Sequence, residues 1–168
     1  MIYYVIALAV ILLDRITKLL VVDKLDLYET IPVIGRFLSI SSHRNRGGAF
    51  SILQNQRTFF IIVTIVIVAG IVWYLQKLIK RGGNRLLATG LGFVMGGAIG
   101  NFIDRVTTGE VVDFVQLHFV FAFFGKHVDY IFPIFNVADV CIDVGIGLIL
   151  LDTILKSRRE KKGLPNEV

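Results

Sequence analysis

Four long apolar blocks alternate with more polar segments along the chain. The blocks run over residues 2–22, 58–76, 86–104 and 135–155. Each is close to the ~20 residues that a helix needs to cross the hydrocarbon core of a bilayer. Backbone polar groups in lipid must be satisfied within the spanning structure, which a helix achieves and an open sheet does not. The pattern therefore predicts an all-α membrane protein with four transmembrane helices in a single domain, 1–168.

The two longer connections between these blocks carry patterns of their own. In the first, residues 37–41 alternate as a half-buried strand does, and Gly47 and Gly48 then break the pattern. We expect a small extracellular β-sheet in this connection. The second connection is rich in aromatic residues, which favour the membrane–water interface. We expect an outer aromatic loop at that interface, over 119–130.

Lysine and arginine are concentrated in two places, and this bias predicts the orientation. They gather in the connection 77–85 and in the tail after residue 155. Because cytoplasmic loops carry an excess of basic residues, both termini should lie in the cytoplasm and the longer connections outside. The composition, with 55% hydrophobic residues, agrees with a membrane protein, and the net charge is +5. The basic residues flank apolar blocks and form no basic face, so no nucleic-acid partner is expected.

Ionisable and amide side chains occur within these apolar blocks or just beyond them. A charge at membrane depth costs ~2.5–3.5 kcal/mol on insertion scales, so such residues indicate function and a partner. Asp14 and Lys18 are four residues apart and can pair on one helix face. The remaining candidates gather near the outer ends of the predicted helices: Asn101, Asp104, Arg105, Asp113, Asp139 and Asp143.

Charge placement alone leaves several interpretations of these acids open. Two carboxylates that meet at the outer surface could share a proton and act as the base and the acid of an aspartyl protease. Alternatively, the acids pair with Lys18 and Arg105 only to hold the helices together. A third interpretation is a small transporter or assembly factor, in which acids at successive depths form an ion path.

Other catalytic chemistries find less support in the sequence. A cysteine nucleophile needs a base, and the three histidines lie in outer segments away from Cys141. Those histidines (His43, His118 and His127) show no spacing typical of a metal site. In the third block, Gly92, Gly96 and Gly100 recur every four residues, which predicts a face that another helix approaches closely.

Five short motifs, in order along the chain, resemble those of the lipoprotein signal peptidase (signal peptidase II) family. Each motif alone is weak, but the ordered set covers most of the chain. The motifs are DRITK at 14–18, NRGGAFS at 45–51, GGAIGNFIDR at 96–105, VVDF at 111–114 and FPIFNVAD at 132–139.

The resemblance implies an aspartyl endopeptidase in the bacterial cytoplasmic membrane. It would remove the signal peptide of a prolipoprotein by cutting before the diacylglyceryl-modified cysteine, with no metal or organic cofactor. Globomycin-type antibiotics would occupy the same site, and membrane lipids would surround it. The family's catalytic pair falls on Asp113 and Asp139. The supporting and substrate-binding positions fall on Asp14, Lys18, Asn45, Gly47, Asn101, Asp104, Arg105 and Asn136.

Several of these residues also have roles that their chemistry suggests. Asn45 and Asn136 can donate to peptide carbonyls or orient carboxylates. Arg105 can hold Asp104, or a lipid ester or phosphate. Asp139 and Asp143 share one helix face and could themselves form a pair, although side chains on one helix diverge more readily than they converge.

The sequence departs from the family pattern in two places. Gly48 stands where the family more often has alanine. The stretch between Asp113 and Asp139 is longer than the resemblance leads one to expect, and the extra length falls within 119–130.

Overall fold

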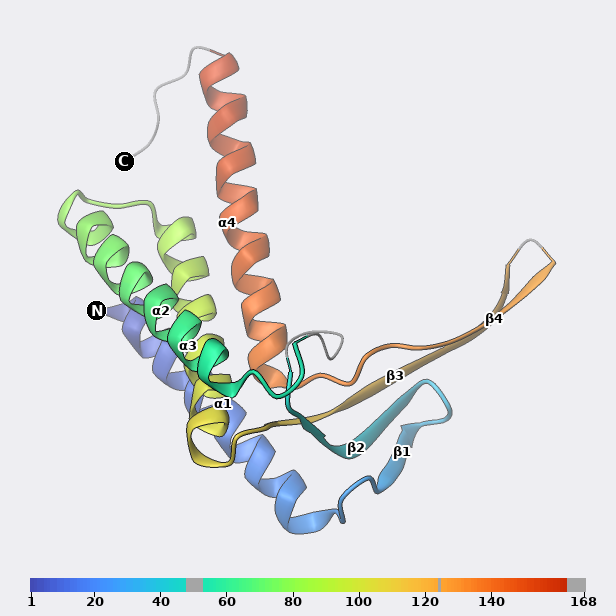
Figure 1. Ribbon diagram of the computed structural model, residues 1–168. Coiled ribbons are helices and arrows are strands. Elements are labelled where there is room, and N and C mark those ends of the chain that lie inside the picture. Colours follow the sequence, from blue (N-terminus) through green and yellow to red (C-terminus); the bar gives the residue numbers. More distant parts are fainter. Residues whose placement is uncertain (48–52, 124, 163–168) are drawn as a thin grey trace.

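The computed structural model describes residues 1–47, 53–123 and 125–162. It contains four long helices, namely α1 (Ile2–Lys24), α2 (Arg57–Lys80), α3 (Arg85–Thr107) and α4 (Val137–Lys161) (Figure 1). The first three contain the predicted apolar blocks and extend them by at most four residues at either end. The fourth begins at Val137, two residues later than predicted, because Asn136 caps it.

Among the described residues, α2 and α3 are long and apolar enough to cross a membrane by length and composition. α1 and α4 are as long but carry more charged residues. The surface of the bundle is apolar over much of its length, as the exposed leucines and isoleucines of α1, α2 and α4 show. Apolar patches of this extent mark a surface that contacts protein or lipid.

α3 lies at the centre of the bundle and packs against α1, α2 and α4. Its glycines permit the close approach to α1: a Cβ at Gly92 would lie 2.8 Å from the carbonyl oxygen of Tyr3, and one at Gly96 would lie 2.8 Å from that of Ala7. The predicted small-residue face is therefore confirmed. The apolar core beside it comprises Ala7, Ile71, Leu75, Leu87, Ala88, Leu91 and Met95.

A four-stranded antiparallel sheet lies at one end of the bundle, in the order β1-β2-β3-β4 (Figure 1). Its strands are β1 (Thr30–Ile34), β2 (Leu38–Asn45), β3 (Val111–Phe123) and β4 (Lys126–Ile131). The expected sheet in the first connection is confirmed, since β2 begins within the alternating segment 37–41. The sheet is larger than predicted, so the description of the fold as all-α is incomplete.

The expected outer aromatic loop is wrong for the described part of 119–130. These residues continue β3, turn at Gly125 and return as β4, so that the segment is a β-hairpin. Its register pairs Phe119 with Tyr130 and Phe121 with Val128. Such cross-strand pairs of aromatic and β-branched side chains stabilise a hairpin. Figure 1 shows the hairpin running outward from the end of the bundle.

The start of β3 is fixed directly to the helices. The backbone N–H of Val112 donates to Asp104 Oδ2 at 3.3 Å, and Val112 packs with Phe114 and Val21 of α1. β3 also bridges to Phe135, just before α4. Asp113 therefore lies where the sheet, α3 and the beginning of α4 meet.

Candidate active site

Asp139 is fixed at the beginning of α4 by reciprocal bonds with the residue that caps this helix. The Asn136 side-chain oxygen accepts from the Asp139 backbone N–H at 3.1 Å, and Asp139 Oδ2 accepts from the Asn136 N–H at 3.1 Å. This is a capping box, which satisfies N–H groups left unpaired at a helix N-terminus. The other oxygen, Oδ1, accepts from Asn101 Nδ2 of α3 at 2.8 Å. Both oxygens of Asp139 are therefore held by named donors.

Asp113 lies on β3 and is buried, with 3% of its surface exposed. Its Oδ2 accepts from Asn45 Nδ2 at 3.0 Å, and its Oδ1 accepts from Asn136 Nδ2 at 2.7 Å. Burial raises the pKa of Asp113 to about 6, and the negative charge of Asp139 acts in the same direction. The hydrogen bonds from the two asparagines oppose this rise in pKa.

Asn136 and Asn101 connect the two carboxylates. Asn136 Nδ2 donates to Asn101 Oδ1 at 3.1 Å as well as to Asp113, and Asn101 then donates to Asp139. Asn136 is fully buried and Asn101 is 6% exposed, so these bonds form away from water. Hydrogen bonds of this kind are strengthened in a low-dielectric interior and fix side-chain positions.

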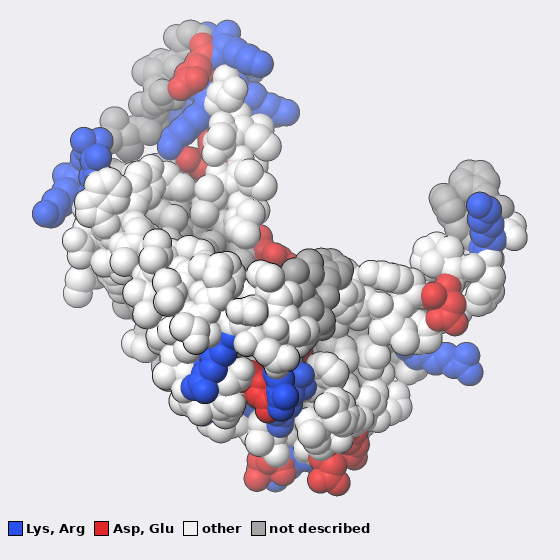
Figure 2. Space-filling model, viewed as in Figure 1, with Lys and Arg blue, Asp and Glu red and all other residues white. Residues whose placement is uncertain are grey.

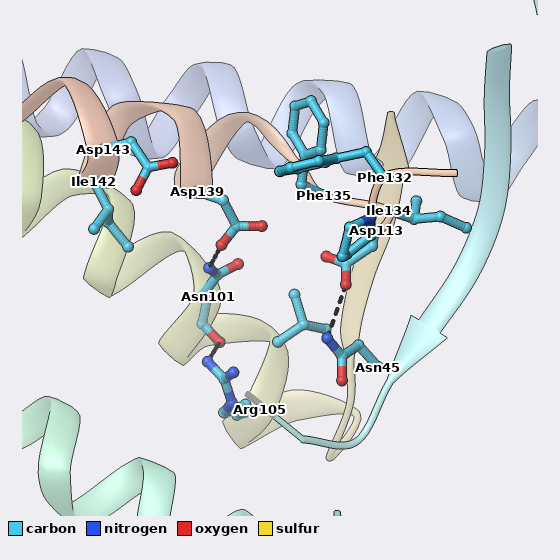
Figure 3. A pocket seen from close by; sticks show the side chains of 12 residues that line it. Asn45, Asn101, Arg105, Asp113, Phe132, Ile134, Phe135, Asp139, Ile142 and Asp143 are labelled. Carbon is cyan, nitrogen blue, oxygen red and sulfur yellow. Dashed lines mark hydrogen bonds between the residues drawn. The ribbon is translucent and has the colours of Figure 1, made fainter. Parts of the chain in front are cut away.

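The two carboxylates face one cavity of about 470 Å³ from different sides (Figure 3). Its polar wall consists of Asn45, Asn101, Arg105, Asp113, Asp139 and Asp143. Its apolar wall consists of Val111, Phe132, Pro133, Ile134, Phe135 and Ile142. A site of this composition can hold a ligand that is largely apolar and has a few polar groups to orient it.

Arg105 holds backbone at the edge of this cavity. Its guanidinium donates to the carbonyl oxygen of Gly47 at 3.1 Å and to that of Asn101 at 3.4 Å. It also lies 4.8 Å from the centre of the Phe60 ring, within range of a cation–π interaction. The Gly47 N–H in turn donates to Asn45 Oδ1 at 2.9 Å, which connects Arg105 to the asparagine that binds Asp113. The other residues of the glycine motif, 48–51, lie outside the described residues.

The suggested pairing of Arg105 with Asp104 is wrong. Asp104 is bound instead by Arg15 of α1 at 3.0 Å and by Lys18 at 3.0 Å. Consecutive residues on a helix point about 100° apart, so Asp104 faces α1 while Arg105 faces the cavity. Arg15 was missed as a partner, although its position next to Asp14 could have indicated it.

Lys18 is the centre of a second polar group, which we call the Lys18 cluster (Asp14, Arg15, Lys18 and Asp104). Lys18 Nζ lies 2.9 Å from Asp14, which confirms the predicted pair, and 2.8 Å from Asn101 Oδ1. Lys18 and Asp14 are each 1% exposed. Asp14 Oδ1 also accepts from the backbone N–H of Ala138, at the start of α4. The cluster therefore ties α1 to both α3 and α4 and contacts Asn101, which lines the cavity.

A further polar group, which the sequence analysis missed, lies at the other end of the bundle. Asp152 of α4 is 5% exposed, pairs with Lys156 at 2.8 Å and accepts from Asn84, the cap of α3. The four-residue spacing of Asp152 and Lys156 was the available signal. Across residues 1–47, 53–123 and 125–162, no group of three or more His, Cys, Asp or Glu side chains is placed to hold a metal ion.

Two carboxylates that come together at one site are the arrangement that aspartic peptidases use. A family model described as signal peptidase (SPase) II matches residues 6–155. The chain therefore belongs to the signal peptidase II family, as the motifs predicted, and it is an aspartic endopeptidase.

This chain is similar to known relatives and to solved structures over nearly its whole length. The chain is 48% identical to a lipoprotein signal peptidase of Halalkalibacterium halodurans, covering 96% of this chain and 97% of that one. It is also 48% identical to one of Shouchella clausii, covering 95% and 97%. Two solved bacterial membrane enzymes share the fold. One has a TM-score of 0.81 at 36% identity, and the match covers 99% of this chain and 93% of that one. The other has a TM-score of 0.74 at 39% identity, and the match covers 90% of this chain and 91% of that one.

Proposed function

We propose that the chain removes the signal peptide from diacylglyceryl-modified prolipoproteins by cutting before the lipidated cysteine, with Asp113 and Asp139 as the catalytic pair. The observation that carries this assignment is their placement: they come from separate elements, β3 and α4, and face one cavity. Both are held there by the same two asparagines, Asn101 and Asn136, directly or through one another.

The environment of Asp113 indicates which carboxylate acts as the acid. Asp113 has a pKa of about 6, so it holds a proton more readily than an ordinary aspartate. Asp139 lies in the first turn of α4, and its two oxygens accept from the Asn136 N–H and from Asn101 Nδ2. Because the pKa of Asp113 is the one that is raised, we assign Asp113 as the acid and Asp139 as the base at the start of the reaction.

The reaction follows from these states. Asp139 takes a proton from a water molecule, and the oxygen of that water attacks the scissile carbonyl carbon. At the same time Asp113 gives its proton to the carbonyl oxygen. The tetrahedral diol then collapses as its hydroxyl proton returns to Asp113 and the proton on Asp139 passes to the leaving nitrogen. The C–N bond breaks, and both carboxyl groups regain their starting protonation.

The remaining polar residues of the site position this pair. Arg105 and Gly47 hold the segment that carries Asn45, and Asn45 fixes Asp113. The Lys18 cluster fixes Asn101 and the start of α4. These residues make their contacts within the protein, so they support the chemistry and take no proton from the substrate.

The membrane placement follows from the distribution of charge. Lys and Arg gather where α4 ends and where α2 joins α3, at the end of the bundle away from the sheet (Figure 2). We assign this end to the cytoplasm and the sheet and cavity to the outer side, with α1–α4 as four spans of one domain. Both termini are then cytoplasmic, in a bacterial plasma membrane.

A substrate that carries two acyl chains stays in the bilayer, so its peptidase must work at the membrane surface. The cavity fits this need because Phe132, Phe135 and Ile142 line it beside the carboxylates. Globomycin-type antibiotics are expected to bind in the same cavity. An ion path fits less well: along α3 the described buried residues between Asn84 and Asn101 are apolar or glycine, so polar groups do not continue across the bundle.

Cleavage of a defined substrate by the purified protein tests this function. The protein in lipid nanodiscs is given a diacylglyceryl-modified prolipoprotein peptide, and mass spectrometry identifies the products. We expect a product that begins at the lipidated cysteine, and no cleavage of the same peptide without the lipid. Cleavage of both peptides at equal rates, or of neither, would contradict the proposed substrate class.

A further inference from the structure

Asp143 is an acidic residue of the cavity that the proposed mechanism does not use. It lies one turn beyond Asp139 on α4, is exposed and lines the same cavity (Figure 3). Within the part of the chain that the structure describes, it has neither a hydrogen-bonding nor an ion-pair partner. The other acids of the four helices that face inward each have one: Asp14, Asp104, Asp139 and Asp152.

The place of Asp143 on a proposed membrane span makes an unpartnered carboxylate there unusual. Its neighbour Ile142 and the aromatic side chains of Phe132 and Phe135 line the same cavity. By the proposed topology this part of α4 lies within the membrane, where acids are found paired or facing a site. A hydrogen-bond donor from a ligand in the cavity would satisfy the carboxylate.

The position of Asp143 indicates which part of a substrate could supply that donor. Four residues of helix advance by about 6 Å, whereas an extended peptide advances by about 3.3 Å per residue. A peptide that runs extended along α4, with its scissile carbonyl at Asp139, would therefore bring a residue about two positions from that carbonyl to Asp143. α4 runs from the outer side toward the cytoplasm, and the signal peptide also lies on the cytoplasmic side of the cut.

The chemistry of the substrate narrows the choice of donor. The diacylglyceryl group offers ester oxygens, which accept hydrogen bonds and do not donate them. A serine or threonine hydroxyl of the peptide does donate, and a carboxylate accepts such a bond strongly. An alanine at the same position leaves Asp143 without a partner.

We propose that Asp143 is a specificity-determining residue that accepts a hydrogen bond from a hydroxyl side chain at the second or third residue before the lipidated cysteine. The inference rests on the proposed function and deepens it. It makes the cavity selective for signal peptides with serine or threonine at that position over those with an apolar residue of similar size.

Diacylated peptides that differ only at these two positions test the proposal. Serine or alanine is placed at the second or at the third residue before the cysteine, and kcat/KM is measured for each peptide. The wild-type protein should prefer serine at one of the positions by about tenfold, the effect of a hydrogen bond to a charged group. Asp143→Leu should abolish that preference. Asp143→Asn should keep a smaller one, because its amide oxygen still accepts.

Gly147→Ala is the matched control for a change on the same helix. It lies one turn beyond Asp143, and an added Cβ there meets no described heavy atom within 4 Å. This variant should show the wild-type ratio of serine to alanine cleavage. The thermal midpoint of each variant is recorded, and if Asp143→Leu fails to fold, the reduced ratio of Asp143→Asn decides the matter.

The outcomes distinguish failure of this proposal from failure of the proposed function. If the wild-type protein cleaves the peptides but shows no serine preference at either position, the role of Asp143 is overturned. The same holds if Asp143→Leu keeps the wild-type ratio. If the wild-type protein cleaves none of the lipidated peptides, the proposed function itself is contradicted.

Discussion

The Lys18 cluster and the Asp113–Asp139 pair are built from the same kinds of side chain, yet they differ in how their charges are compensated. In the cluster, two carboxylates meet two cations, and Lys18 contacts Asp14, Asp104 and Asn101 within 3.0 Å. In the pair, the partners are neutral asparagines, and both carboxylates face a cavity. The first arrangement compensates the charges with cations inside the protein, whereas the second holds both carboxylates with neutral donors at the wall of the cavity.

This difference suits the two groups to different proposed purposes, which are support of the helix bundle and chemistry. A fully paired acid ties helices together, and removing its partner is costly because a charge is left uncompensated. The pKa of Asp113 is raised by burial even though two amides donate to its carboxylate, which is the state that the proposed acid requires. Asn101 belongs to both groups, since it accepts from Lys18 and donates to Asp139.

The largest expected effect comes from removing either acid of the pair. Asp113→Asn and Asp139→Asn keep the size of the side chain but remove the group that exchanges a proton. Each should lower kcat by on the order of 100- to 10,000-fold, as expected for a lost general acid or base. Single-turnover cleavage of a diacylated peptide measures this. Asp23→Asn, on the exposed end of α1, is the matched control and should cleave normally.

Breaking the Lys18 cluster should act on stability more than on chemistry. Lys18→Met keeps the length of the side chain but leaves Asp14 without its cation, and Asp104 with only Arg15. We expect a loss of roughly 3–5 kcal/mol in the free energy of unfolding, as for other broken buried pairs. Unfolding in detergent or lipid measures this loss.

Lys24→Met provides the control on the same helix. Lys24 pairs with Asp23 at the surface, where both side chains are largely exposed, so its replacement should change stability little. Equal effects of the two substitutions would contradict the distinction between them. So would a Lys18→Met protein that folds and binds substrate normally but has no turnover, because Lys18 would then take part in the reaction.

A smaller effect concerns the pH dependence of the reaction. If Asp113 acts as the acid, kcat/KM should fall as the pH rises through about 6, where its proton is lost in the free enzyme. The hydrogen bond from Asn45 lowers the pKa of Asp113, so Asn45→Ala should raise that pKa. The alkaline limb should then move upward by on the order of one pH unit.

Gln116→Ala, which changes an amide on the same strand outside the cavity, should leave the alkaline limb in place. An alkaline limb that moves to lower pH in Asn45→Ala, or that moves equally in both variants, would contradict the assignment of Asp113 as the acid.

The smallest expected effect concerns the hairpin of β3 and β4. Residues alternate between its two faces, so Phe121 lies on the face with Phe119 and Tyr130, while His127 and Asp129 lie on the other. We expect the aromatic face to lie in the membrane–water interface on the outer side of the plasma membrane. Spin labels at Phe121 and His127, in a chain with Cys141 replaced, should differ: the first should be more accessible to oxygen and the second to a water-soluble relaxation agent. Equal accessibilities would place the hairpin away from the membrane.

The helices could be predicted well from the sequence, because their apolar blocks are long and contain few charged residues. The sheet could be predicted only in part. β1 was missed because Pro32 is unusual in a strand, although it is tolerated here since β1 is an edge strand. The hairpin was missed because residues 119–123 are continuously apolar or aromatic, so the alternation that marks a strand is absent from the sequence.

The site residues were predicted from motifs, but their partners required the three-dimensional structure. The four-residue spacing of Asp14 and Lys18 was enough to predict that pair, because it lies within one helix. The pairing of Asp104 with Arg15 joins residues 89 positions apart, and only the packing of α1 on α3 brings them together. The chain of bonds from Asp113 through Asn136 and Asn101 to Asp139 likewise depends on where β3 meets α4. The catalytic role of the pair stays a prediction.

The central claim is that Asp113 and Asp139 act as one catalytic unit, and the double variant tests it most directly. Single-turnover cleavage rates are measured for Asp113→Asn, Asp139→Asn and Asp113→Asn/Asp139→Asn, with substrate binding and thermal midpoints recorded for each. The double variant should be little slower than either single variant, because removing one member of the unit already stops the chemistry. Single variants that still turn over, with losses that simply multiply in the double variant, would contradict the account.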